Sequence, residues 1–385
     1  MSIPHGRNPP AAVPFNRHWN APGEAEAVAE ALRSGHLCGD GPFTRRCQER
    51  LAALLDGTPT LLTPSGTAAL ELAALLLGER PGSVVVPSFT FPSTASAFAL
   101  RGLTLRFADA EPATACVSAQ TIAAAAAPDT VGVCLVHYAG IACDMEPILA
   151  LVRARGWWLV EDAAHALGGA YRGRPLGTFG DLAAFSFHET KNASCGEGGA
   201  LAVGRRALLA RAEILREKGT DRSRFFRGEV DKYGWQELGS SYLLAEVLAA
   251  VLSAQLAAFA AIQERRRAVW LRYAQALAGW AREQGIALPQ PPPWAQPAWH
   301  AFWMVFPDLA ARSAFISHMR ARGIIAPFHY QALHVSPLGQ RLGGRRGQCP
   351  VAERLSDCLV RLPLFAGISE TQVQLVIDAA LAFRA

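Results

Sequence analysis

Lysine is nearly absent from this chain of 385 residues. Of its 37 basic residues only three are lysines, Lys191, Lys218 and Lys232. Lys191 follows the apolar run LAAFSF and precedes the glycine-rich turn CGEGG. An amine can form a Schiff base with a carbonyl compound, whereas a guanidinium cannot. A lone lysine is more often a solvated loop residue, so the rest of the sequence must decide between that interpretation and a chemical role.

Other familiar patterns are also missing. The eight cysteines are scattered without a CxxC pair or histidines at metal-ligand spacing, which argues against a zinc site and against a disulfide framework. The net charge is only +5 and the arginines are dispersed, so nucleic-acid binding is not expected. Prolines and charges interrupt residues 1–15, where a signal peptide requires an apolar core. We therefore expect a mildly basic cytoplasmic enzyme without a bound metal.

One apolar run, from residue 242 to 262, reaches the length of a membrane span and has a single formal charge, Glu246. It is rich in alanine, has Ser253 and Gln255 near its middle, and its helical periodicity continues beyond residue 262. Uniformly apolar helices also lie in the cores of large soluble proteins. We therefore expect a long buried or interface helix and no membrane span.

Apolar runs of strand length alternate with helical patterns in the first half of the chain. The run 131–136 is followed by a helical segment, 144–155, and then by a second run, 157–162. Strand, helix and strand with short connections predict a parallel βαβ crossover. The same pattern is found at 60–64, 66–77 (with Gly78 after it) and 84–88, and a strand at 199–203 leads to a helix at 205–217.

A proline-rich segment, residues 287–299, marks the one convincing linker. Two further strand-like runs and two helical patterns follow it. The sequence therefore predicts an α/β protein with a large domain on a mostly parallel sheet and a smaller C-terminal α+β domain. The expected divisions are an N-terminal extension (1–14), the large domain (15–240), a long connecting helix (241–285) and the small domain (286–385).

Polar residues follow three of the predicted strands. Gly66 and Thr67 open a helix, where free N–H groups and the helix dipole suit a phosphate, although a plain N-cap also explains the motif. Asp162 ends a buried strand, where a carboxylate is costly without a cation or donors, unless it caps the next segment. Lys191 lies 29 residues later. If the three converge at the carboxyl edge of the sheet, they provide what a pyridoxal phosphate enzyme requires.

A family resemblance extends over nearly the whole chain, from about residue 15 to 383. It is carried by TPSGTAALELAALLLG, VPSFTFPSTASAFALRG, VHYAGIACDM, VEDAAHALGGAY, GDLAAFSFHETKNASCGEGGALAV and PFHYQALH. The sequence resembles the DegT-type sugar nucleotide aminotransferases, which are fold type I pyridoxal phosphate enzymes. Within that family it is most similar to the dTDP-4-amino-4,6-dideoxygalactose transaminases, through CGDGPFTRRCQERL, SFHETKN, REKGTDRSRFFRGEVDKYGW and RLPLF.

The resemblance implies roles for individual residues around pyridoxal 5'-phosphate. Lys191 would bond covalently to the cofactor and then shuttle a proton between the substrate carbon and the cofactor C4′. Asp162 would pair with the ring nitrogen and keep the ring cationic. His165 and Phe91 match the positions against the two ring faces, although either residue type is common in a protein core.

The remaining implied contacts concern the phosphate and the substrate. Gly66, Thr67 and Ser186 match the phosphate contacts, although a strand-end serine can simply bond to the backbone. The basic loop from 216 to 233, with Lys218 and Arg227, could meet a nucleotide diphosphate or be a solvated charged loop. His329 matches a position near the sugar pocket, and His334 in the same segment is the weaker candidate.

The resemblance also implies a homodimer with shared active sites. Many relatives carry Gly-Tyr-Asn ahead of the long helix, and that Asn reaches the phosphate of the neighbouring subunit. Here Gly239 is followed by Ser240 and Ser241. The contact must therefore be shorter or lost, and we interpret the change as a trait of the subgroup.

The implied function is transfer of an amino group from L-glutamate to C4 of a dTDP-linked 4-keto-6-deoxy sugar, giving dTDP-4-amino-4,6-dideoxygalactose for polysaccharide or glycoconjugate synthesis. Amination at C3, or of a UDP- or GDP-linked keto sugar, is the alternative among enzymes. A non-catalytic regulator that binds the cofactor is the alternative from another class, and the intact set of Lys191, Asp162 and His165 argues against it. Sugar dehydration is disfavoured because relatives with that chemistry lack the lysine or add iron–sulfur cysteines.

Overall fold

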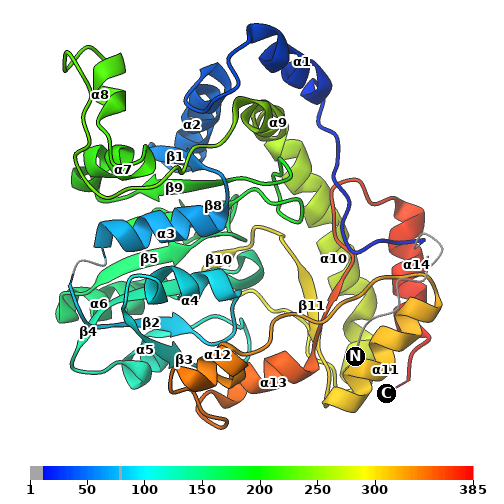
Figure 1. Cartoon of the computed structure of the whole chain (residues 1–385). Coiled ribbons are helices and arrows are strands. Elements are labelled where there is room, and N and C mark those ends of the chain that lie inside the picture. Colours follow the sequence, from blue (N-terminus) through cyan, green and yellow to red (C-terminus); the bar gives the residue numbers. More distant parts are fainter. Residues whose placement is uncertain (1–11, 78–79, 385) are drawn as a thin grey trace.

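The computed structural model describes residues 12–77 and 80–384. A large α/β part holds the central sheet, and a smaller part lies beside it (Figure 1). This architecture confirms the predicted fold class, an α/β protein with a smaller C-terminal α+β part. The first eleven residues of the predicted N-terminal extension, and Gly78 after the predicted helix 66–77, lie outside the described residues.

The large sheet has seven strands, and it is mostly parallel as predicted. Its strands in spatial order are β1 (Thr60–Thr63), β9 (Gly199–Val203), β8 (Leu182–Ser186), β5 (Trp158–Asp162), β4 (Thr130–Val136), β2 (Ser83–Pro87) and β3 (Thr104–Ala108). Only β9 runs against its neighbours, β1 and β8. Nearly every residue of the inner strands is buried, because helices cover both faces. The parallel strands therefore end together at one edge of the sheet.

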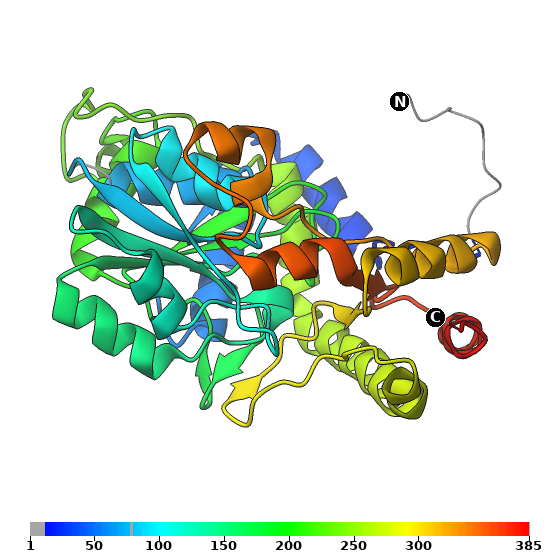
Figure 2. The same cartoon turned by 90° about the horizontal axis from the view of Figure 1, so that it is seen from below.

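Helices cover the two faces of the sheet, as Figure 2 shows from below. On one face lie α3 (Gly66–Leu77), α4 (Pro92–Ala99) and α7 (Leu209–Arg216). On the other lie α5 (Ala119–Ala125) and α6 (Met145–Arg155), and α6 ends at the left-handed Gly156. This part also contains α1 (Glu24–Ser34), α2 (Pro42–Leu54) and α8 (Arg222–Phe226).

The single helix expected from 241 to 285 is wrong, because the segment forms two helices. These are α9 (Glu246–Ala257) and α10 (Phe259–Glu283), whose axes differ by 64°. Helix α9 packs on α1 and α2, whereas α10 packs on a helix of the small part, so each buries its apolar side against a different partner. Hydrophobic periodicity continues across such a bend and does not record it.

Among the described residues, no single helix is long and apolar enough to cross a membrane. The bent pair α9 and α10 meets the criteria of length and composition only when the two helices are taken together.

The small part has its own apolar core, built around the strand pair β11 (Phe302–Val305) and β12 (Leu359–Leu362). Its helices are α11 (Leu309–Ala321), α12 (Pro337–Arg341), α13 (Pro350–Cys358) and α14 (Glu370–Leu381). Side chains of α10 are buried in the same core. The proline-rich segment is anchored rather than free, since β10 (Ala295–Gln296) pairs with β6 (Ala170–Tyr171), which pairs with β7 (Arg174–Pro175). The domain boundaries proposed from the sequence stay a prediction.

Candidate active site

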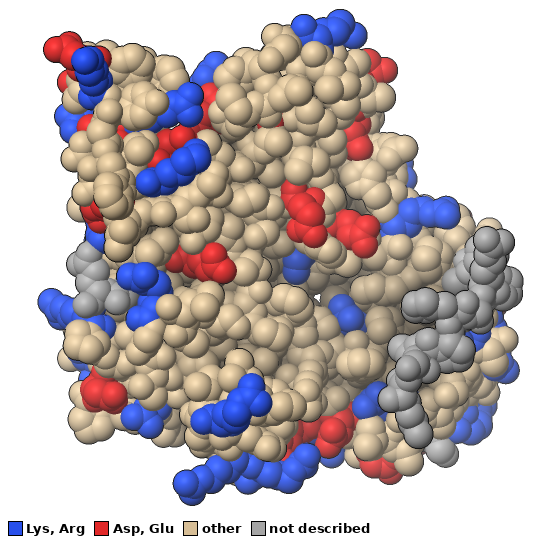
Figure 3. All heavy atoms as spheres, viewed as in Figure 1, with Lys and Arg blue, Asp and Glu red and all other residues tan. Residues whose placement is uncertain are grey.

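A cavity of about 790 Å³ opens where the carboxyl ends of β5 and β8 face the small part. Figure 3 shows the face of the molecule seen in Figure 1, which is hollowed near its middle, with basic and acidic atoms around the hollow. Eight of the residues singled out from the sequence line this cavity: Gly66, Thr67, Phe91, Asp162, His165, Ser186, Lys191 and His329. Segments up to 263 residues apart in the chain thus meet at one place, as expected for ligand sites in open α/β sheets.

Lys191 lies in the turn that follows β8, where its backbone N–H donates to the carbonyl of His188 at 2.8 Å. Part of its side chain is accessible from the cavity, and protein atoms enclose the rest. Burial lowers the pKa of the amine to about 8; Asp162 opposes this shift and Arg361 adds to it. Among the described residues, no carboxylate lies within ion-pair distance of this amine. Near neutral pH a useful fraction of the amine is therefore unprotonated and nucleophilic.

Asp162 is the last residue of β5 and is almost completely buried. Its Oδ2 accepts a hydrogen bond from the Thr94 hydroxyl at 2.7 Å, and its Oδ1 accepts one from the Ala164 N–H at 3.1 Å. Burial nevertheless raises the pKa of this carboxyl group above its ordinary value. The carboxylate thus lacks full compensation, and a cationic pyridine nitrogen would supply it.

The N-terminus of α3 forms one wall of the cavity. Ser65 accepts a hydrogen bond from the Ala68 N–H at 3.0 Å, but the N–H groups of Gly66 and Thr67 have no acceptor among the described residues. A Cβ added at Gly66 would lie 2.9 Å from the Cβ of Ser186, so the close approach of β8 requires glycine here. The Ser186 hydroxyl makes only a long contact, 3.4 Å, with the His188 N–H. The Thr67 hydroxyl is bonded to that of Ser93 at 2.7 Å, but the free amides at this helix N-terminus fit a phosphate.

Four histidines line the cavity, and for three of them, His165, His300 and His329, burial lowers the pKa well below its ordinary value. The His165 ring stacks on that of His300 with centroids 4.1 Å apart, and its Nδ1 accepts a hydrogen bond from the Ala139 N–H at 3.3 Å. His329 bonds through Nδ1 to the Tyr138 hydroxyl at 2.7 Å. These three imidazoles are therefore neutral at neutral pH and contribute no positive charge to the cavity.

Two other candidates occupy different environments. Phe91 precedes α4 at the cavity wall and is 56% exposed, so the alternative of a core phenylalanine does not hold. His334 is fully buried between the Ser88 hydroxyl and Glu353, does not line the cavity, and has a structural environment.

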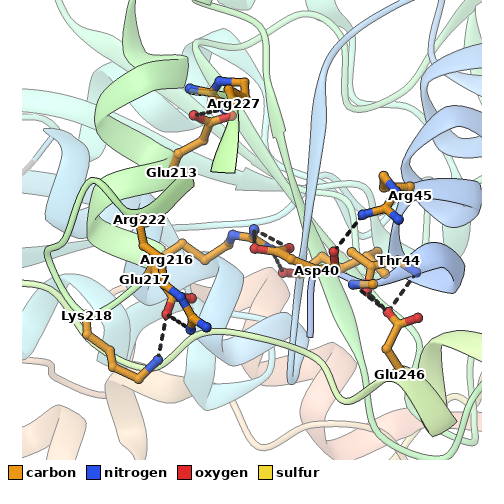
Figure 4. A network of polar contacts seen from close by, with 12 residues as sticks. Asp40, Thr44, Arg45, Glu213, Arg216, Glu217, Lys218, Arg222, Arg227 and Glu246 are labelled. Atoms are coloured by element: carbon orange, nitrogen blue, oxygen red, sulfur yellow. Dashed lines mark hydrogen bonds and ion pairs between the residues drawn. The ribbon is translucent and has the colours of Figure 1, made fainter. Parts of the chain in front are cut away.

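The predicted substrate residues Lys218 and Arg227 do not line this cavity. Figure 4 shows them with acidic partners on and near α7: Lys218 pairs with Glu217 at 2.9 Å, and Arg227 pairs with Glu213 at 3.0 Å. Arg227 borders another hollow together with the Arg216–Asp40 pair, and Lys218 lies outside the lining of that hollow. Within one chain these cations therefore meet carboxylates, and their contact with a substrate stays a prediction.

Sequence reasoning missed several residues in or behind the cavity wall. Thr94 bonds to Asp162, Tyr330 lies at the wall with a left-handed backbone (φ 31°), and His300 and Arg361 project from the small part. Tyr330 and Arg361 lie in PFHYQALH and RLPLF, two segments of the family resemblance. Nothing in the local pattern around His300 points to a site.

Behind Asp162, the side chain of Glu161 enters a separate buried network. Its carboxylate accepts hydrogen bonds from His137 Nε2 and from the N–H groups of Gly177, Phe179 and Gly180, at 2.7 to 2.9 Å. Burial alone would raise the pKa of Glu161, but these donors outweigh it and leave the pKa below its ordinary value. This carboxylate therefore has its compensation within the fold and ties the turn before β8 to the end of β5.

Taken together, the α/β sheet and the lysine, aspartate and helix N-terminus at its edge fit a cofactor-binding transferase of the pyridoxal phosphate type. The chain belongs to the DegT/DnrJ/EryC1/StrS aminotransferase family, which matches residues 20–381. Members of this family depend on pyridoxal phosphate.

Solved structures agree with this membership. The aminotransferase TlmJ from Streptoalloteichus hindustanus is 31% identical, with a TM-score of 0.86 over 96% of this chain and 97% of that one. DesV from S. venezuelae is 32% identical, with a TM-score of 0.84 over 92% of both chains. The 3-amino-5-hydroxybenzoic acid synthase is 26% identical, with a TM-score of 0.85 over 96% of this chain and 98% of that one. Proteins of this fold thus include at least one whose product is not a sugar.

Proposed function

We propose that this protein is a pyridoxal phosphate-dependent aminotransferase that moves the amino group of L-glutamate to C4 of a dTDP-4-keto-6-deoxy sugar, giving dTDP-4-amino-4,6-dideoxygalactose. One observation carries the proposal: Lys191, Asp162 and the N-terminus of α3 line a single cavity. A protein that only binds the cofactor has no need of a buried amine with a lowered pKa beside it.

The residues present fit the cofactor and suggest how each would act. Gly66, Thr67 and Ser186 would hold the phosphate, and the carboxylate of Asp162 would keep the ring nitrogen protonated. Pyridoxal phosphate supplies an electron sink for the negative charge left when a substrate carbon loses its proton. The amine of Lys191 would bind the cofactor covalently until the amino group of the donor takes its place. The released amine would then carry that proton from the substrate carbon to the cofactor C4′, on the other side of the nitrogen. The neutral ring of His165 would lie against the cofactor.

The sugar nucleotide is proposed from the segments shared with the dideoxygalactose transaminases. In such families a few pocket residues can decide the substrate, so the alternatives are a C3 keto sugar and a UDP- or GDP-linked one.

We expect the purified holoenzyme to convert dTDP-4-keto-6-deoxyglucose and L-glutamate into an amino sugar with galacto configuration at C4. Product NMR against a panel of 3-keto, UDP-linked and GDP-linked sugars identifies the carbon, its configuration and the nucleotide. A large preference for another member of the panel would contradict the proposed substrate and leave the aminotransferase assignment intact.

We also propose a homodimer with shared active sites. The segment between α7 and α9 extends away from the body of the chain (Figure 1), and it exposes large apolar side chains: Phe226 is 69% exposed, Trp235 74% and Leu238 78%. Exposed apolar groups of this size are typical of interfaces. In a dimer this segment could bring Lys218 and Arg227 to the cavity of the partner subunit.

Sedimentation of the wild-type chain at micromolar concentration should give twice the mass of one chain. Replacing Trp235 and Leu238 together by serine should shift the equilibrium towards the monomer, whereas Leu375→Ser on α14, which is 47% exposed, should not. A wild-type chain that sediments as a monomer would exclude the dimer.

A further inference from the structure

Arg361 is a cation of the cavity wall, and the described part of the chain gives it no counter-charge. It lies on β12, and its Nη2 donates to the Phe328 carbonyl at 3.1 Å. The guanidinium carbon lies 4.5 Å from the centroid of the Phe15 ring. Among the described residues, no carboxylate lies within ion-pair distance, Nη1 makes no hydrogen bond, and Nε is buried without a partner.

Two more deeply buried arginines of this chain have more partners. Arg216 pairs with Asp40 through two oxygens, and Arg266 donates to the backbone carbonyls of Trp299 and His300. For Arg361, burial lowers the pKa, and only the hydroxyls of Tyr138 and Tyr330 act against that shift. A charge removed from water without a partner is costly, so its place at a cavity wall points to an anionic ligand.

We propose that Arg361 binds a carboxylate of the amino acid donor in the half of the reaction that loads the amino group. The proposal rests on the proposed aminotransferase function and names the residue that recognises the donor. Guanidinium donors match the two oxygens of a carboxylate, and this geometry gives orientation as well as affinity.

The position of Arg361 favours the donor over the other anions that the site must receive. The cofactor phosphate has its own cradle at α3, on the large part, whereas Arg361 comes from the small part. Its charge reaches Lys191, whose pKa it lowers. In an amino acid, the α-carboxylate is bonded to the same carbon as the reacting amine, so it must lie near Lys191. In a sugar nucleotide, the diphosphate is on C1 and lies across the ring from C4.

The same cavity must also accept a keto sugar, which has no carboxylate. The free donors of Arg361 can then bond to neutral hydroxyl groups, which are weaker acceptors than a carboxylate. Loss of Arg361 should therefore harm the donor half-reaction far more than the sugar half-reaction. A residue that only supports the fold would harm both alike.

The test uses the holoenzyme and its Arg361→Gln, Arg361→Lys and Arg354→Gln variants. Arg354 is exposed on α13 outside the cavity and is the matched control for loss of one positive charge. Calorimetry gives the dissociation constant of glutarate, a dicarboxylate that cannot react. Single-turnover experiments follow the two half-reactions separately. L-Glutamate reacts with the pyridoxal phosphate form of the enzyme, and the keto sugar reacts with the enzyme reconstituted with pyridoxamine phosphate.

We expect Arg361→Gln to weaken glutarate binding and to raise the half-saturating glutamate concentration, each by about 10- to 100-fold. This is the change in affinity that corresponds to the loss of one charge-assisted hydrogen bond. Arg361→Lys should recover part of the loss, and the keto-sugar half-reaction should stay close to that of Arg354→Gln. If Arg361→Gln does not fold, the wild-type enzyme must still bind glutarate more tightly than the uncharged diamide of glutarate.

Unchanged glutarate binding with an impaired keto-sugar half-reaction would overturn the proposal and assign Arg361 to the sugar nucleotide. Equal losses in both half-reactions would overturn it in favour of a structural role. Failure of every keto sugar to react would count against the proposed function alone, because glutarate binding and the glutamate half-reaction still decide the role of Arg361.

Discussion

Replacement of Lys191 by alanine is expected to abolish amino transfer, with a fall in kcat/KM of at least about 10⁴-fold, because one side chain serves as both the covalent anchor and the proton carrier. The turn that holds Lys191 is fixed by backbone hydrogen bonds, so alanine should leave the fold intact. The variant should also lose the visible absorbance of the covalently bound cofactor. Either activity or that absorbance in the variant would remove Lys191 from its proposed role.

The scarcity of lysine gives this experiment clean controls. Lys218 and Lys232 are the other two lysines of the chain, and neither lines the cavity. Borohydride reduction of the holoenzyme followed by peptide mass mapping should place the cofactor on the peptide with Lys191. Alanine at Lys232 should leave the adduct unchanged.

The pKa of Lys191, which burial lowers to about 8, sets the expected pH dependence. The free amine is the nucleophile, so the rate of covalent cofactor uptake by the apoprotein should rise with pH and level off above about 8. The folded-state pKa lies below that of an unfolded lysine, near 10.4. Between these two values the unfolded chain binds more protons, and the contribution of this group to the stability of the apoprotein therefore rises with pH. A flat uptake profile from pH 6 to 9 would contradict the lowered pKa.

The sequence was sufficient to predict those site residues whose position is set by the end of a strand. Asp162 and Lys191 follow buried strands, and parallel strands bring their carboxyl ends to one edge. Glu161 and Asp162 are adjacent carboxylates, but side chains of a strand alternate between its faces. One of them therefore enters the cavity and the other the network around His137.

Other features depend on packing between distant segments and leave no local pattern. The small part supplies Arg361 and His300 to the cavity, and only the folded arrangement brings them opposite β5 and β8. The change of direction between α9 and α10 follows from their different packing partners. Lys218 and Arg227 were predicted from their charge alone, and charge does not reveal that carboxylates on neighbouring turns already pair with them.

The second large effect is expected for Asp162→Asn, which should lower kcat by about 10²- to 10⁴-fold. This is the rate factor lost when a catalytic group has the wrong protonation state. The amide keeps the shape of the carboxylate and can still accept the hydrogen bond of the Ala164 N–H. It has no negative charge, so the ring nitrogen of the cofactor loses its proton and with it the capacity to stabilise negative charge. Cofactor absorbance as a function of pH should report this deprotonation directly.

Asp144→Asn is the matched control, since Asp144 accepts a hydrogen bond from the Tyr171 hydroxyl at 2.6 Å outside the cavity. It should leave both kcat and the absorbance unchanged. Activity of Asp162→Asn within about tenfold of the wild type would mean that the carboxylate does not hold the ring proton.

Asp162→Asn, which should lower the activity, should raise the stability of the apoprotein. Burial raises the pKa of Asp162 above its value in the unfolded chain, so the folded state binds a proton at this carboxyl group more readily. The contribution of Asp162 to the free energy of unfolding therefore falls as the pH rises from the unfolded-state pKa through the folded-state pKa. At neutral pH the apoprotein therefore holds a poorly compensated carboxylate, which asparagine removes. We expect apo Asp162→Asn to melt at a higher temperature than the apo wild type. A site that gains stability as it loses activity is one where the charge is retained for a cationic ligand and not for the fold.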